Sequence, residues 1–153
     1  MADSQADEIT TLNTLTNTLI DSVTGYEDAA GNIQSTSFQQ LFRERASERS
    51  RAAEEIRAEV RRLGGNPEDD GSFLGKTHQR FLDLKAAITG RDEKAIVNEV
   101  ERGEDYLKEK FETAISGGTL SGEARTVVER VYQSVRKGHD QMSALKHGME
   151  SNA

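Results

Sequence analysis

The chain has 153 residues, a net charge of −7, 31% charged residues, 5% aromatic residues and no cysteine. Its length suffices for one domain, residues 1–153, with a hydrophobic core. The lack of cysteine excludes disulfides and thiolate chemistry, and the acidic balance argues against nucleic-acid binding. We see no membrane-spanning run and no signal peptide, so we expect a cytoplasmic protein. The amino-acid composition is typical of an all-α protein.

The first predicted helix covers about residues 7–33. Its apolar residues recur with the helical period of 3.6 and include Leu12, Leu15, Leu19, Val23, Tyr26 and Ile33. Glu27 lies close to this apolar stripe. The second predicted helix covers about residues 37–63, with Ser37 and Gln40 as a capping box.

The apolar ends of the second helix enclose a charged middle that contains Arg45 and Glu48. Gly64 and Pro67 mark its end. A shorter helix is predicted at about residues 72–89, in the connection that follows.

Two further long helices are predicted at about residues 92–116 and 121–147, capped by Asp92 and Ser121. Each has a polar residue in the middle of its apolar stripe, Glu104 in the first and His139 in the second. Four long helices with one long connection, residues 64–91, predict a ferritin-like four-helix bundle with a short extra helix in the crossover.

Several short stretches carry a resemblance to a known family. They include Leu41-Phe42-Arg43-Glu44-Arg45-Ala46, Val60-Arg61-Arg62-Leu63-Gly64-Gly65, Asp83-Leu84-Lys85-Ala86-Ala87, Glu101-Arg102-Gly103-Glu104-Asp105 and His139-Asp140. In these stretches the chain resembles a bacterial family of uncharacterised ferritin-like four-helix-bundle proteins, a domain of unknown function. The resemblance implies a fold and no assigned reaction.

Ferritin-like di-iron proteins hold their metal with carboxylates and Glu-x-x-His pairs that project into the bundle. Candidate ligands for iron or manganese in this chain are Glu27, Glu48, Glu104 and His139. Two cations depart from the pattern, since Arg51 follows Glu48 by three residues and Arg136 precedes His139 by three.

The same region allows a second interpretation, a central layer of ion pairs in place of a metal site. Its members would be Arg45, Glu48, Arg51, Glu104, Arg136 and His139, whose charges can neutralise one another. Gly25, Gly103 and Gly138 lie within helices close to these residues, although glycine costs about 1 kcal/mol relative to alanine there. Close helix approach, or room for a ligand, would account for them.

The leading functional hypothesis is a non-catalytic bundle without a cofactor that acts through self-association or a protein partner. The short helix from Phe73 to Ile88 is the surface we expect to form a dimer, because it carries two phenylalanines that a four-helix core would not fully cover. The rival hypothesis is a carboxylate-bound iron or manganese protein. We expect neither nucleic acid nor membrane as a partner.

Overall fold

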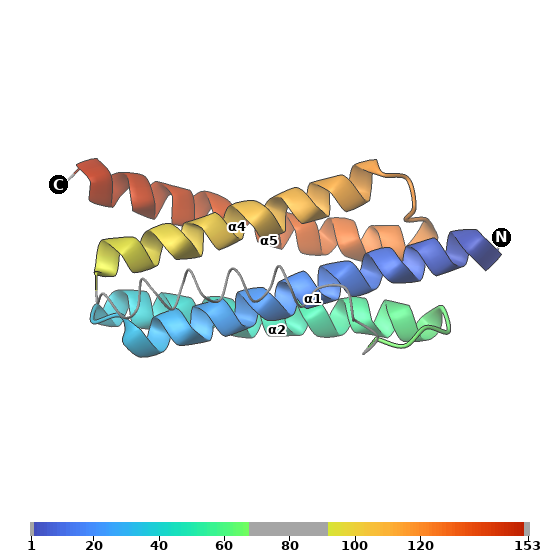
Figure 1. Cartoon of the computed structure of the whole chain (residues 1–153), viewed down its shortest axis with the longest axis horizontal. Helices are drawn as coiled ribbons and strands as arrows, with labels where there is room; N and C mark the ends of the chain where they lie inside the picture. Colours follow the sequence, from blue (N-terminus) through green and yellow to red (C-terminus); the bar gives the residue numbers. More distant parts are fainter. Residues whose placement is uncertain (1, 68–91, 152–153) are drawn as a thin grey trace.

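The structure, a computed structural model, describes residues 2–67 and 92–151. These residues form four helices and no strand: α1 (Ala2–Asn32), α2 (Thr36–Arg62), α4 (Glu93–Ser116) and α5 (Gly122–Ser151). Figure 1 shows them as two long hairpins packed side by side. The all-α prediction is confirmed for this part of the chain. The predicted helix at residues 72–89, with the expected dimer surface, lies outside the described residues.

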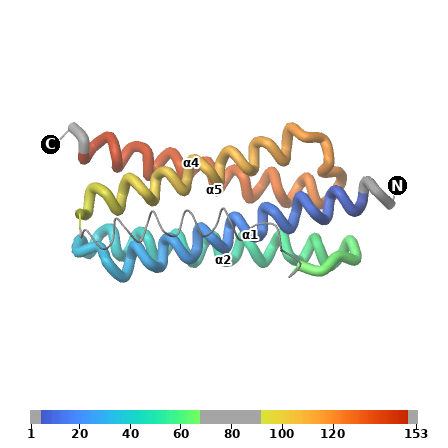
Figure 2. Tube along the Cα trace, viewed as in Figure 1, coloured from blue at the N-terminus to red at the C-terminus, as the bar shows by residue number. Residues whose placement is uncertain are grey.

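Each helix packs against two others, and the contacting pairs are α1–α2, α4–α5, α1–α4 and α2–α5. The tube in Figure 2 shows that both neighbours of any helix run antiparallel to it, whereas α2 and α4 run in the same direction. The parallel helices α2 and α4 are therefore diagonal partners in the bundle. The end of α2 and the start of α4 therefore lie at opposite ends of the bundle (Figures 1 and 2).

The helix ends follow local capping chemistry, with one correction. Asp92 caps α4 as predicted, because its carboxylate accepts from the backbone N–H groups of Lys94 (3.1 Å) and Ala95 (3.4 Å). Gly64 has the expected left-handed conformation after α2, with φ of 86°. The cap of α2 is Ser35 rather than Ser37, since Ser35 is extended and its Oγ accepts from the Phe38 N–H.

Two helices are longer than their apolar patterns indicated. The first begins at Ala2 instead of residue 7, and the last continues to Ser151 instead of residue 147. The start of α5 is attached to α1, because the backbone N–H and the hydroxyl of Ser121 both donate to the Glu8 carboxylate at 3.0 Å. No helix in the described ranges is long and apolar enough to cross a membrane.

The core divides into two apolar clusters along the bundle. Residues of one cluster include Leu12, Leu19, Ile56, Phe111, Val128 and Val135. Residues of the other include Tyr26, Phe42, Val97, Val100 and Met142. Between them lies a polar layer, which interrupts the core at the middle of all four helices.

Candidate functional site

The polar layer follows from a seven-residue spacing in the sequence. Residues seven apart are separated by about two helical turns, so they lie along one line on the same side of the helix, and here that line faces the core. On each helix one such position is polar or glycine, flanked by apolar residues on both sides. The four positions are Ser22 (between Leu15 and Ala29), Arg49 (between Phe42 and Ile56), Glu104 (between Val97 and Phe111) and Gly138 (between Val131 and Leu145).

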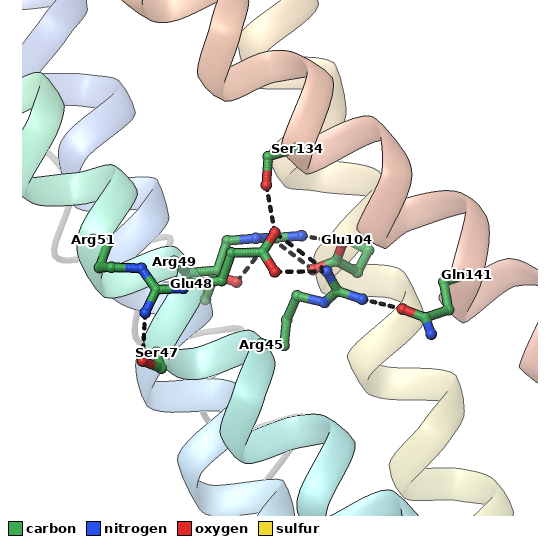
Figure 3. A network of polar contacts seen from close by, with 9 residues as sticks. Arg45, Ser47, Glu48, Arg49, Arg51, Glu104, Ser134 and Gln141 are labelled. Carbon is green, nitrogen blue, oxygen red and sulfur yellow. Dashed lines mark hydrogen bonds and ion pairs between the residues drawn. The ribbon is translucent and has the colours of Figure 1, made fainter.

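Arg49 and Glu104 form a two-pronged ion pair at the centre of this layer (Figure 3). The guanidinium donates from Nη1 to Oε1 and from Nη2 to Oε2, both at 2.8 Å, and each side chain is only 1% exposed. Nη1 also donates to the Ser22 hydroxyl at 3.2 Å. The planar fork of arginine matches a carboxylate in this geometry, which makes the pair both strong and directional.

A second set of contacts joins α2 to α5 beside this pair. Arg45 donates to the Glu48 carboxylate, at 3.3 Å to Oε2, and to the side-chain oxygen of Gln141. The Ser134 hydroxyl donates to Glu48 in turn. With Arg49, these contacts connect α2 to each of the other three described helices (Figure 3).

Gly138 provides the space that the two guanidinium groups occupy. A Cβ atom at this position would lie 2.5 Å from Arg49 Nη2 and 3.0 Å from Arg45 Cζ and Nη1. The close approach expected at Gly138 is therefore to side chains of α2. Gly103 differs, because a Cβ there would meet no atom within 4 Å. For Gly25 close approach stays a prediction.

Burial and charge shift the protonation equilibria around the pair. Burial alone would lower the pKa of Arg49, but the Glu104 carboxylate more than reverses this and the guanidinium stays charged. The pKa of Tyr26 is raised well above its ordinary value of 10.0 by burial and by the nearby Glu104 carboxylate, against the opposing charge of Arg49. The Tyr26 ring lies under the same guanidinium, with its centroid 5.9 Å from Arg49 Cζ.

Two arginines expected in the central layer lie outside it. Arg51 is exposed and donates to the Ser47 hydroxyl on the outer side of α2, and Arg136 is exposed on α5. The physical reason is helical phase: Arg49, not Arg51, is seven residues from both Phe42 and Ile56. Sequence reasoning missed Arg49 as the partner of Glu104, although this spacing was available to find it.

His139 also lies away from Glu104, because Gly138 holds the core-facing position before it. Its ring is largely buried between α4 and α5, with Nε2 2.5 Å from Asp105 Oδ1 and Nδ1 3.1 Å from Asp140 Oδ1. Burial lowers the pKa of His139, but the hydrogen bonds with Asp140 and Asp105 outweigh it, so the pKa is raised. The His139 partner correspondingly lowers the pKa of Asp140.

The four residues named as ligands for iron or manganese are not brought together. Glu27 is exposed, and Glu48 is engaged by Arg45 and Ser134. Both oxygens of Glu104 accept from Arg49, and His139 faces Asp105. A di-iron centre needs carboxylates that are free to bind metal, but here the Arg49 guanidinium occupies the Glu104 carboxylate. This set of residues therefore does not fit a di-iron centre.

The fold and the central layer define the class: an all-helical protein with four described helices and a buried arginine–glutamate pair between two apolar clusters. The family described as Domain of unknown function (DUF2383) matches residues 7–117. This match covers more than half of the chain, so the chain belongs to that family. The matched range, residues 7–117, includes Ser22, Arg49 and Glu104 and ends before α5. No protein with a curated description matches the chain.

Proposed function

We propose that this protein is a non-catalytic, ferritin-like four-helix bundle in which the Arg49–Glu104 pair replaces a di-iron centre. The observation that carries the proposal is the pair itself, fully buried and bidentate. The ferritin-like assignment is supported by the parallel diagonal helices α2 and α4 (Figures 1 and 2) and by the length of sequence between Arg62 and Glu93. The resemblance to uncharacterised bacterial bundles agrees with it.

In this proposal the ion pair gives the bundle one unique arrangement and adds little net stability. Removing two charges from water costs several kcal/mol, roughly what their mutual attraction returns. A wrong helix register would bury Arg49 or Glu104 alone, which costs far more. The bundle is then a rigid scaffold, and its biological action belongs to its outer surface.

We propose self-association as that action, through residues 73–88, in a cytoplasmic setting consistent with the absence of cysteine. Sedimentation velocity of the full chain over a range of concentrations tests this, and a dimer is the expected species. Phe73→Ser combined with Phe81→Ser should shift the wild-type dimer to monomer. A strict monomer at the highest concentration would contradict self-association.

The proposal that the centre of the bundle binds no metal has its own experiment. Iron and manganese are measured by elemental analysis in wild type and in the paired variant R49M/E104L, both purified without chelator. We expect the same metal content in both, because the Glu104 carboxylate is paired with the Arg49 guanidinium and is not available to a metal ion. Metal that is present in the wild type and lost from the paired variant would support the rival iron or manganese protein instead.

A further inference from the structure

A second cluster of polar side chains lies between α4 and α5, away from the central pair. Glu101 and Asp105 are four residues apart and therefore project from the same side of α4. His139 approaches them from α5. One ligand atom from each of the three residues lies within 4.8 Å of the others.

His139 Nε2 and Asp105 Oδ1 are 2.5 Å apart, and the ligand atoms of all three residues lie within 4.8 Å of one another. Donor atoms bound tetrahedrally to one zinc ion are about 3.4 Å apart, given metal–ligand distances of about 2.1 Å. A cation would need the side chains to rotate to this spacing; Asp105 is exposed, and Glu101 is paired with Lys146 through one carboxylate oxygen. The exposed Asp105 also gives a cation a path from solvent.

The orientation of the imidazole is an independent indication. Nδ1 of His139 is hydrogen-bonded to Asp140 at 3.1 Å, and this leaves Nε2 directed at Asp105. Metal-binding histidines are held in the same way, with a carboxylate on the ring nitrogen that does not bind the metal. Asp140 is not one of the three proposed ligands. Its carboxylate contacts the ring nitrogen of His139 that does not face Asp105, as an orienting carboxylate does.

We propose that Glu101, Asp105 and His139 form a binding site for one divalent transition-metal cation of the zinc class. Two carboxylates balance the charge of the cation, and the imidazole favours zinc or cobalt over magnesium or calcium. Water completes the coordination. This site uses His139, but none of the carboxylates of the central layer.

The Lys146 ammonium and a proton on His139 both compete with a metal ion for the proposed ligands. The Lys146 ammonium lies 3.3 Å from Glu101 Oε2 and neutralises that carboxylate. A proton on His139 would likewise exclude the metal, so binding is best measured at about pH 8. Loading the site displaces Lys146, whose side chain is partly exposed and free to turn into solvent.

Equilibrium dialysis of the full chain against zinc chloride, followed by elemental analysis, tests the proposal. We expect wild type to hold one equivalent of zinc, and magnesium chloride to give no binding. His139→Gln and Asp105→Asn should each lose the bound zinc. His147→Gln is the matched control, since His147 is exposed on the same helix, and it should bind as wild type does.

Two variants separate a metal site from an ordinary ion-pair network. Asp140→Asn should weaken zinc binding by about 10- to 100-fold, as loss of an orienting carboxylate does elsewhere. Lys146→Gln should tighten it, because the competing charge is gone. Thermal melts without metal confirm that each variant folds. The proposal is overturned if wild type binds no zinc, if His139→Gln binds as wild type does, or if Lys146→Gln fails to tighten binding.

Discussion

Arg49 and Glu104 join two helices that do not pack against each other. Arg49 is on α2 and Glu104 on α4, the parallel pair on one diagonal of the bundle, and their side chains meet at 2.8 Å across its centre. The other two helices complete the layer, since Ser22 accepts from Arg49 and Gly138 leaves the space for it. All four helices must therefore be in one relative register for the layer to form.

Glu104→Gln tests the cost of breaking the pair. The substitution keeps the shape of the side chain but leaves the Arg49 charge buried without a counter-charge, so we expect unfolding to become easier by about 3–5 kcal/mol. Urea denaturation followed by circular dichroism measures this. Glu109→Gln on the exposed side of the same helix is the control, and its effect should stay within about 0.5 kcal/mol. Equal effects of the two substitutions would contradict a buried ion pair.

The paired variant R49M/E104L should behave differently from either single substitution. Replacing a buried ion pair by apolar residues of similar volume often leaves the stability of a protein unchanged or raises it by about 1–4 kcal/mol. We expect the double variant to be at least as stable as wild type, with R49M and E104L each far below it. A double-mutant cycle in urea gives the coupling energy. Additive losses would show that the two residues act independently.

Gly138→Ala tests whether glycine is required by the arginines of α2. Alanine normally stabilises a helix interior by about 1 kcal/mol relative to glycine. Here the new Cβ would lie 2.5 Å from Arg49 Nη2, which its bonds to Glu104 hold in place, so we expect a loss of about 1–3 kcal/mol from overpacking.

Gly103→Ala is the matched control for this substitution, because its Cβ would meet nothing within 4 Å. It should stabilise the protein. The penalty at Gly138 should also shrink in the R49M/E104L background, where the guanidinium is absent. A Gly138→Ala protein that gains stability as Gly103→Ala does would exclude the steric explanation.

Apolar periodicity was enough to predict the four long helices and the burial of Glu104. It did not identify the partner of Glu104. Arg45 and Glu48 follow Phe42 at helical spacing and lead on to Arg51, whereas the seven-residue line from Phe42 to Ile56 runs through Arg49. A buried arginine in a run of exposed ones has no distinct composition, so only its phase could reveal it.

The cluster of Glu101, Asp105 and His139 was beyond sequence reasoning for a different reason. The sequence predicts His139 and Glu104 in one central layer, because both interrupt the apolar stripes of their helices at the middle. The structure places Gly138 on the core line, and His139 is then rotated by about 100° toward the side of α4 that carries Asp105. This pairing depends on how α4 and α5 dock, which neither helix encodes alone.

The buried Tyr26 predicts how stability responds to alkaline pH. Its pKa in the folded protein is well above the ordinary value of 10.0, because burial and Glu104 disfavour the phenolate. Above about pH 10 the unfolded chain releases this proton while the folded protein keeps it, so the free energy of unfolding falls as pH rises, by up to about 1.4 kcal/mol per pH unit.

Tyr26→Phe should remove this part of the pH dependence, measured by urea denaturation at a series of alkaline pH values. Tyr132 is the matched comparison: its hydroxyl donates to Glu112 at 2.6 Å and its pKa is also raised, but it lies on the solvated side of α5. Tyr132→Phe should therefore remove less of the slope than Tyr26→Phe, because water screens the Glu112 charge. If Tyr26→Phe leaves the alkaline slope at its wild-type value, the phenol of Tyr26 is not held neutral by the central layer.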